Sequence, residues 1–344
     1  MPLCQTVTVD LDTLHRTALD ALRSALRGAR KVALVNFPNH GNPGDPGLWL
    51  GTRALLRELG VRVGYQASPT SLDLDALVRA TGDCPVLING GGNFGDLYRG
   101  QHDARLELLK SSHGRPIIQL PQSIQFEHPE NAALVAQLIA DQDDFTMMVR
   151  DHRSRDLSSQ LLGVEAVLSP DHIFGLHPLT VTATVRHDIL WMVWAPGARE
   201  FTSASQLTNP PERVHVEDWI SGSARAHEQF DRFGRFAWTV NRKLGAEPTL
   251  PPRHAWPVIA ATFGPLARRW FERGVKLVAE SEVLVTNKLH GHLVATLLGK
   301  PHVVLDNSYG KVSGALDTWT RSLPGVHVAA DADEALRVAG GLLE

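Results

Sequence analysis

The sequence is poor in cysteine, in long apolar runs and in net charge of either sign. Two cysteines, Cys4 and Cys84, among 344 residues cannot build a framework of disulfides, which indicates a reducing compartment. No apolar run approaches the about 20 residues that span a bilayer, and the first residues lack the basic and then apolar segments of a signal peptide. A net charge of -3 argues against a nucleic-acid partner held by bulk electrostatics. We therefore expect a cytoplasmic protein whose contact with a membrane is at most peripheral, at its inner face.

Signatures of common cofactor sites are also missing. The chain has 16 histidines but neither an HExxH motif nor paired CxxC spacings, so we expect no metal site. The glycine-rich turn after the first strand is not GxGxxG and no Walker lysine follows it, so a generic nucleotide site is poorly supported. We expect no bound cofactor.

The composition and the hydrophobic pattern indicate a two-domain α/β protein. A hydrophobic content of 43% with 21% charged residues is typical of a soluble globular chain, and 344 residues exceed one ordinary core. Apolar, β-branched runs alternate with helical spacing, which is typical of open parallel sheets. The alternation pauses near residues 176–186, so we expect an N-terminal domain at 1–178 and a C-terminal domain at 179–344.

Residues 196–252 form the least regular part, an insertion with scattered proline, glycine, aromatic and charged residues. Long irregular segments in compact domains are usually lids, binding loops or disordered stretches. Trp219, Phe230 and Trp238 argue against full disorder of this insertion.

The stretch from Ser281 to Lys311 carries the clearest candidate site. Apolar residues predict a short buried strand ending at Thr286, and i, i+4 leucine spacing predicts the helix that follows. Lys288 and His290 lie where the strand ends and the helix begins, which is where ligands of open parallel sheets bind. Free backbone N–H groups at a helix start favour anions. A cation and an imidazole at this turn therefore predict an acidic, phosphorylated ligand.

Two glycine-rich turns follow earlier predicted strands. In the first, at residues 38–47, Asp45 suits a helix N-cap and Pro46 the first helical position, and the glycines either form a tight capped turn or approach a ligand. In the second, Gly90–Gly92 follow a strand at 84–89. Three consecutive glycines expose backbone N–H groups and let a ligand approach closely. A flexible loop is the alternative, but we favour the ligand-lining role.

Basic residues mark two further places. Arg150 follows a strand predicted at 145–149 and is either an anion ligand or a solvated partner of Asp151. A basic cluster on the helix predicted at 255–279 consists of Arg268, Arg269, Arg273 and Lys276. This cluster is either a solvated helix face or, less favoured, a contact with an anionic membrane.

Four signatures, taken in order, resemble those of the polysaccharide pyruvyl transferase family. They are Asn39–Asp45 (NHGNPGD), Asn89–Asp96 (NGGGNFGD), Val149–Ser154 (VRDHRS) with Ser169–Asp171, and Thr286–Gly291 (TNKLHG) with Asp306–Lys311 (DNSYGK). They extend from residue 39 to residue 311, so the resemblance covers most of the chain. It implies two Rossmann-like domains that face a cleft, similar to the GT-B glycosyltransferases, with the acceptor on the N-terminal side and the donor on the C-terminal side.

The resemblance also implies an activity, the transfer of the pyruvyl group of phosphoenolpyruvate onto a saccharide to form a pyruvate ketal. The partners would be phosphoenolpyruvate, as a co-substrate, and an exopolysaccharide, cell-wall or lipid-linked glycan precursor. Two features depart from the family pattern. Lys288 stands where the family usually has arginine, and lysine binds a phosphate or carboxylate only as a point charge. Arg199 and Glu200 lie behind an inserted turn, later than the family's arginine and acidic residues.

The candidate site residues fall into three groups on this interpretation. His290 is the candidate general acid, with hydrogen bonding to the donor as its alternative role, and Asp45 or Asp96 is the candidate base. Asp45 has a helix cap as its alternative role. The donor-binding candidates are Arg150, Lys288, Leu289, His290 and Lys311. The residues expected to line the acceptor side of the cleft are Asn42, Gly44, Asp45, Gly91, Gly92 and Asn93.

Two other functions stay open at this point. A nucleotide-sugar-dependent GT-B glycosyltransferase would need a ribose-binding acid, for which Asp306 is the candidate. A non-catalytic glycan- or phosphosugar-binding protein is favoured if Lys288 does not replace the family's arginine.

Overall fold

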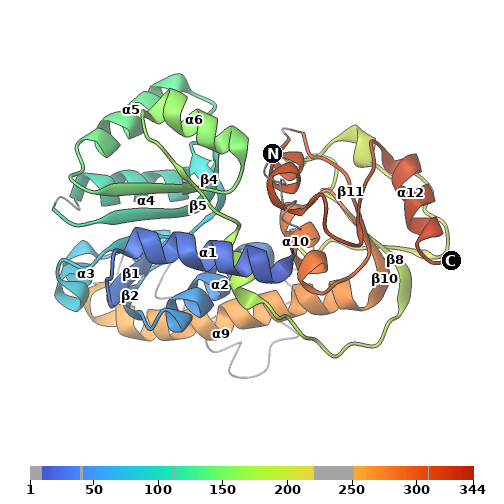
Figure 1. Ribbon diagram of the computed structural model, residues 1–344, viewed down its shortest axis with the longest axis horizontal. Coiled ribbons are helices and arrows are strands. Elements are labelled where there is room, and N and C mark those ends of the chain that lie inside the picture. The colour runs from blue at the N-terminus through green and yellow to red at the C-terminus, as the bar shows by residue number, and fades with distance from the viewer. Residues whose placement is uncertain (1–9, 39–41, 112–113, 221–251, 309) are drawn as a thin grey trace, which may run out of the picture.

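The computed structural model describes residues 10–38, 42–111, 114–220, 252–308 and 310–344. It is an α/β protein built on two parallel sheets with helices packed around each (Figure 1). Cys4, Phe230, Trp238 and Tyr309 lie outside the described residues, as do the first three residues of the first signature.

The first sheet has seven parallel strands in the order β2-β1-β3-β5-β6-β7, with β4 paired to β5. The strands are β1 (Lys31–Val35), β2 (Arg62–Gln66), β3 (Val86–Ile88), β4 (Gly91–Gly95), β5 (Ile117–Gln125), β6 (Phe145–Val149) and β7 (Val167–Leu168). The helices of this part are α1 (Leu11–Leu26), α2 (Gly44–Glu58), α3 (Leu74–Thr81), α4 (Arg99–Ser111), α5 (Pro129–Ala140) and α6 (His152–Leu162). The hydrophobic pattern predicted this alternation because the inner strands β1, β3, β5 and β6 are mainly buried.

The second sheet has five parallel strands in the order β9-β8-β10-β11-β12. The strands are β8 (His187–Met192), β9 (Val214–Val216), β10 (Ser281–Thr286), β11 (His302–Val304) and β12 (Val326–Val328). Its helices are α9 (Pro252–Ala279), α10 (Leu289–Leu297), α11 (Lys311–Ala315) and α12 (Ala332–Gly341). The strand order reverses direction between β8 and β10. In open α/β sheets a ligand crevice lies at the carboxyl ends of such a pair.

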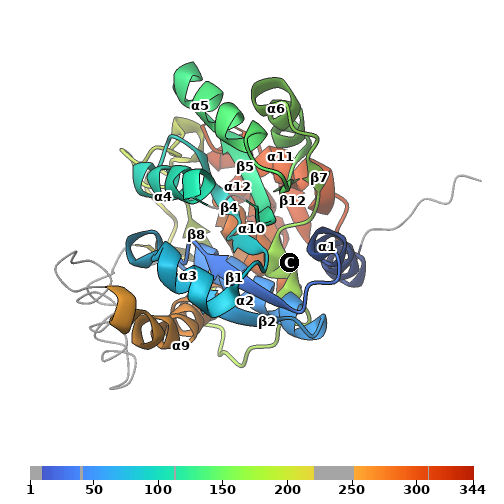
Figure 2. The same cartoon turned by 90° about the vertical axis from the view of Figure 1, so that its left-hand side faces the viewer.

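Helix α9 belongs to the cores of both sheets and runs along the lower edge of Figure 1 (see also Figure 2). Phe263 stacks on Phe37, which follows β1, with ring centroids 4.0 Å apart. Further along the helix, Phe271 and Val275 pack among residues of the second sheet and α10. The division of the chain at residue 178 therefore remains a prediction, because α9 follows that point and still packs on the first sheet.

Two segments of the first sheet differ from the prediction. Gly91–Gly95, part of a turn in the prediction, forms strand β4 against β5. Strand β5 continues through Pro121, beyond the predicted end at Leu120. Its register shifts between Gln119 and Gln122, the kind of irregularity at which a strand tolerates a proline.

The described part of the 196–252 insertion is also more regular than expected. Val214–Val216 pair with β8 as the edge strand β9. Trp219 is fully buried and packs in the core of the second sheet. A three-residue strand is too short to give a periodic sequence signal.

Candidate functional site

A cavity of about 330 Å³ lies between the two sheets, at the carboxyl ends of β8 and β10. It is lined by Asn42, Asp45, Gly92, Asn93, Tyr98, Gln101, Trp194, Glu200, Trp219, Asn287, Lys288, Leu289, His290, Asn307 and Lys311. Eight of the residues predicted for the site are in this set, and they come from all the signatures except the one around Arg150. The cavity is where the reversal of strand order places a ligand crevice.

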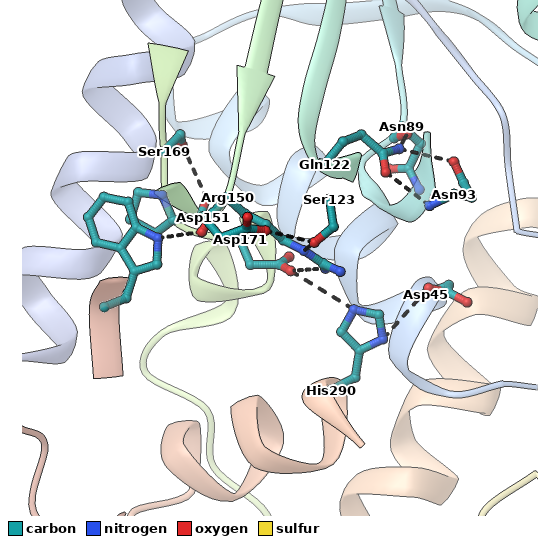
Figure 3. Close-up of polar contacts among 12 residues, drawn as sticks. Asp45, Asn89, Asn93, Gln122, Ser123, Arg150, Asp151, Ser169, Asp171 and His290 are labelled. Carbon is teal, nitrogen blue, oxygen red and sulfur yellow. Dashed lines mark hydrogen bonds and ion pairs between the residues drawn. The ribbon is translucent and has the colours of Figure 1, made fainter. Parts of the chain in front are cut away.

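A row of charged side chains crosses from one sheet to the other beside this cavity (Figure 3). Nδ1 of His290 lies 3.6 Å from a carboxylate oxygen of Asp45, and Nε2 lies 3.9 Å from one of Asp171. The same oxygen of Asp171 accepts a 2.7 Å hydrogen bond from Nη1 of Arg150. Ser123 accepts a second hydrogen bond, of 2.9 Å, from Nε of Arg150. The imidazole is thus held between two carboxylates.

His290 is placed by tight backbone packing at the start of α10. The Thr286 hydroxyl donates to the carbonyl of Met192 and accepts from the N–H of Lys288, which joins the ends of β8 and β10. A Cβ added at Gly44 would overlap the His290 ring, so only glycine allows the two elements to come this close. Burial lowers the pKa of His290 to about 4, which Asp45 and Asp171 offset only in part. The imidazole is therefore neutral at pH 7.

Lys311 and Arg150 bring two positive charges to the same point. A Cβ added at Gly92 would overlap Nζ of Lys311 and lie 3.1 Å from Nη2 of Arg150. Burial, and then the charge of Arg150, lower the pKa of Lys311 to about 8. Nη2 of Arg150 is buried and has no hydrogen-bond partner among the described residues. Two adjacent cations, one with an unused donor, favour an anion between them.

Lys288 lies on another wall of the cavity, and its charge is already engaged. Its Nζ lies 3.2 Å from a carboxylate oxygen of Asp218 and 3.2 Å from the centroid of the Trp194 ring. Burial lowers the pKa of Lys288 to about 8, and Asp218 opposes that shift. An arginine with its larger planar head would not occupy this position in the same way.

A buried polar network fixes the glycine-rich side of the cavity. The backbone N–H of Asn93 donates to Gln122, and the Gln122 amide donates back to the Asn93 side chain, each at 3.1 Å (Figure 3). Arg105, fully buried, donates to the same side-chain oxygen of Asn93 and to Gln119. Burial lowers the pKa of Arg105 to about 9. The asparagine is therefore presented to the cavity in one orientation.

Two of the predicted local roles are wrong. Asp45 is not a helix N-cap: α2 begins at Gly44, one residue before it, and Pro43 is the cap. The side chain of Asn42 accepts the free N–H of Gly44 and donates to Asp45, which leaves the carboxylate of Asp45 facing His290. Pro46 is correspondingly the third helical residue.

The alternative that Arg150 is a solvated partner of Asp151 is also wrong. Arg150 is only 1% exposed and pairs with Asp171. The Asp151 side chain instead caps α6 by accepting the N–H of Ser154.

Four other predicted residues do not line the cavity. Gly44 packs directly against the His290 side chain, and Gly91 lies against Leu48. Asp96 accepts from the backbone N–H groups of Glu127 and His128 and from the side-chain amide of Asn131, so it fixes the segment that leads into α5. Asp306 is exposed, and it accepts from the backbone N–H groups of Asn307 and Ser313.

Several lining residues have roles that the sequence pattern did not assign. Glu200 is only 6% exposed and accepts a 2.9 Å hydrogen bond from the Tyr98 hydroxyl. Trp194 and Trp219 add aromatic surface, and the indole N–H of Trp219 is buried without a partner among the described residues. The only sequence signal for a role of Glu200 was that it resembles the family's acidic residues at this point, although it lies later in the chain, after an inserted turn. Arg199, its neighbour, points away and pairs with Glu127.

A metal-binding cluster and a membrane-spanning helix are both absent from the described part of the chain. Within it, no group of three or more histidine, cysteine or acidic side chains is placed to hold a metal ion. None of its helices combines the length and the apolar character needed to cross a bilayer.

Comparison with known proteins identifies the family. A sequence model described as polysaccharide pyruvyl transferase matches residues 18–234 and 271–309, well over half of the chain. The chain belongs to the polysaccharide pyruvyl transferase family. The match includes the residues of the cavity from Asn42 to Asn307, and it ends just before Lys311.

Curated relatives within this family are similar over nearly the whole chain. Pyruvyl transferase 1 of Schizosaccharomyces pombe is 28% identical over 325 residues, which are 90% of this chain and 75% of that protein. The putative pyruvyl transferase EpsO of Bacillus subtilis is 26% identical over 307 residues, 89% of this chain and 90% of that protein. A functionally uncharacterized Klebsiella pneumoniae protein of known structure shares the fold, with a TM-score of 0.56, 16% identity and coverage of 92% of this chain and 98% of that one.

Proposed function

We propose that this protein transfers the pyruvyl group of phosphoenolpyruvate onto a saccharide and forms a pyruvate ketal, in a cleft arranged as in the GT-B glycosyltransferases. Membership of the polysaccharide pyruvyl transferase family supports pyruvyl transfer to a saccharide. The observation that carries the choice of donor is the convergence of Lys311 and Arg150 beside His290, because phosphoenolpyruvate carries a phosphate and a carboxylate that need fixed positive groups.

The donor is held by Arg150, Lys311 and the start of α10. The unused N–H of Arg150 and the ammonium of Lys311 bind the phosphate or the carboxylate, and the free N–H groups from Leu289 onward bind the other anionic group. Lys288 contributes less to binding of the donor than the family's arginine would, because Asp218 neutralises its charge.

His290 is the general acid in this proposal. Negative charge on the donor raises the low pKa of the imidazole, so His290 takes up a proton when the donor binds. It gives this proton to the methylene carbon of phosphoenolpyruvate, and the carbon that bears the phosphate becomes positively charged. A sugar hydroxyl attacks that carbon and passes its proton to Asp45.

The second half of the reaction closes the ketal. The carbon–oxygen bond to phosphate breaks, and inorganic phosphate leaves with the electron pair of that bond and takes the proton held by Asp45. A second hydroxyl of the same sugar then attacks the carbon and passes its proton to His290, which restores the general acid. One phosphoenolpyruvate and one diol thus give one cyclic ketal and one phosphate, without a cofactor or a metal.

The acceptor lies on the side of Asn42, Gly92 and Asn93, against the aromatic surface of Trp194 and Trp219. Its class is an exopolysaccharide, cell-wall or lipid-linked glycan precursor. We also propose that the reaction takes place in the cytoplasm, at the membrane where the acceptor is lipid-linked.

The test is phosphate release from phosphoenolpyruvate in the presence of a panel of glycans, followed by mass spectrometry of the glycan. We expect a product heavier by one pyruvyl unit and a loss of about 100-fold in turnover for His290→Gln. Release of a nucleoside diphosphate from a nucleotide sugar would support a glycosyltransferase instead. Donor-independent glycan binding without phosphate release would support a non-catalytic binding protein.

A further inference from the structure

A second cavity, of about 590 Å³, lies between α2, α9 and the segment after residue 175. Its lining is mainly apolar and consists of Leu50, Ala54, Leu176, Leu179, Val181, Phe271 and Val275, with Thr180, Gly264 and Pro265. It shares no residue with the cavity that holds Lys311 and His290. We refer to it as the α2–α9 groove.

Four arginines surround this groove: Arg53, Arg57, Arg268 and Arg269. Glu272 is the only acidic residue among the described lining residues. The groove therefore combines an apolar floor with a strongly positive rim. The chain as a whole carries a net charge of -3, so this concentration of positive charge is local.

Three of the four arginines on the rim, Arg53, Arg57 and Arg268, have no acidic partner among the described residues. Arg53 and Arg57 lie one helical turn apart on α2, and burial together with the charge of Arg57 lowers the pKa of Arg53. Arg53 donates to the amide oxygen of Gln66, a neutral partner. In the described part of the chain, none of Arg53, Arg57 and Arg268 forms an ion pair with an acidic side chain. Adjacent unpaired cations favour an added anion.

An apolar surface accompanies the charge. Val181, which lines the groove, is 40% exposed, and Val185, four residues further along the same segment, is 41% exposed. Large apolar side chains that face water next to a basic cluster are typical of surfaces that enter the boundary between lipid head groups and acyl chains.

We propose that the α2–α9 groove binds anionic phospholipid at a membrane surface, with the head-group phosphate on the arginine rim and the start of an acyl chain on the apolar floor. Guanidinium groups bind phosphate bidentately, and long basic side chains keep their charged ends at the head-group level while their stems lie on apolar surface. The proposed lipid site shares no residue with the catalytic cavity. Within the basic cluster of α9, Arg268 and Arg269 line the groove, whereas Lys276 pairs with Glu280.

The experiment is sedimentation of the full chain with vesicles of phosphatidylcholine alone or with phosphatidylglycerol added. The variant is Arg57→Glu with Arg268→Glu, two exposed positions outside the catalytic cavity. The matched control is Arg321→Glu with Arg337→Glu, which makes the same change in net charge at two exposed positions elsewhere. Circular dichroism checks that each protein is folded.

We expect the wild type to sediment with the anionic vesicles and not with the neutral ones, and to be released by salt. The groove variant should partition at least about 10-fold more weakly, and the control should behave like the wild type. Equal binding to neutral vesicles, an unaffected groove variant, or an equal loss in the control would each overturn the proposal. So would release of the protein from vesicles by a soluble acidic peptide at a stoichiometric amount, because that would make the groove a peptide site.

Discussion

The charge state of Lys311 gives a sharp test of the donor site. Burial and the neighbouring Arg150 lower its pKa to about 8, so the ammonium is lost in the mildly alkaline range. If this ammonium binds the phosphate, the dissociation constant of phosphoenolpyruvate should rise by roughly 15-fold between about pH 8 and about pH 9.5, the change expected for one titrating group. The ordinary pKa of a guanidinium lies well above that of an ammonium, so Lys311→Arg should move the rise to higher pH and remove most of it from this range.

The assay is isothermal titration calorimetry of phosphoenolpyruvate, which needs no acceptor. The control is Lys276→Arg, an exposed lysine of α9, which should keep the pH dependence of the wild type. Lys288 has a similarly low pKa, so Lys288→Arg must be measured beside it. An affinity that does not change with pH in the wild type would refute the reasoning. If the dissociation constant still rises with pH in Lys311→Arg but no longer does so in Lys288→Arg, then Lys288 is the lysine that binds the donor.

Three further predictions follow from the geometry. Gly92→Ala places a methyl group on Nζ of Lys311 and should weaken binding of phosphoenolpyruvate by about 10-fold in calorimetry, whereas Gly100→Ala, at a position with open space, should not. His290→Gln should reduce phosphate release far more than affinity for the donor; equal losses in both would indicate a binding role alone. The buried pair of His292 and His302 is neutral, and its pKa values are lowered by burial, that of His302 to about 4. The pair therefore makes its full contribution to stability above about pH 6.5. As the pH falls towards 4, the free energy of unfolding decreases by on the order of 3 kcal/mol through the protonation of His302. Urea unfolding at several pH values, with His302→Gln for comparison, measures this loss.

The tautomers of that histidine pair are set by its hydrogen bonds. Nδ1 of His302 donates to the carbonyl of Lys300, so its Nε2 accepts from Nδ1 of His292 at 2.7 Å. Nε2 of His292 then accepts from the hydroxyl of Thr320. Protonation of His302 at Nε2 would place two N–H donors face to face between the rings, which is why acid is expected to unfold this part of the second sheet.

The turn that carries His290 could be predicted from the sequence because its signals are local. A buried strand, a polar pair and a leucine-spaced helix follow one another within a few residues, and the structure confirms β10 and α10 there. Because ligands of open parallel sheets bind at the carboxyl ends of the strands, signatures that are far apart in the sequence could be assigned to one site. The roles of these residues in catalysis stay predictions.

What could not be predicted depends on contacts between distant residues. Asp218 lies 70 residues before Lys288, and nothing in the local pattern indicates that it would engage the lysine. The cap of α2 was predicted at Asp45, two residues after its actual place at Pro43. Asn42 and Asp45 are both good capping types, and only the approach of His290 separates their roles. A strand made of glycines, β4, has no apolar periodicity to detect, since its pairing with β5 provides its order.

The helix shared by both cores has a consequence for how substrates enter. Opening the cavity by rotating one sheet away from the other would pull either Phe263 or Phe271 out of its packing, and exposing a buried phenylalanine costs on the order of 2 kcal/mol. Wide hinge motion between the sheets is thus disfavoured. Admission of a large glycan should instead depend on the loops at the rim of the cavity, so that only the terminal sugar of a long acceptor passes inside while the remainder of the polymer stays in solvent.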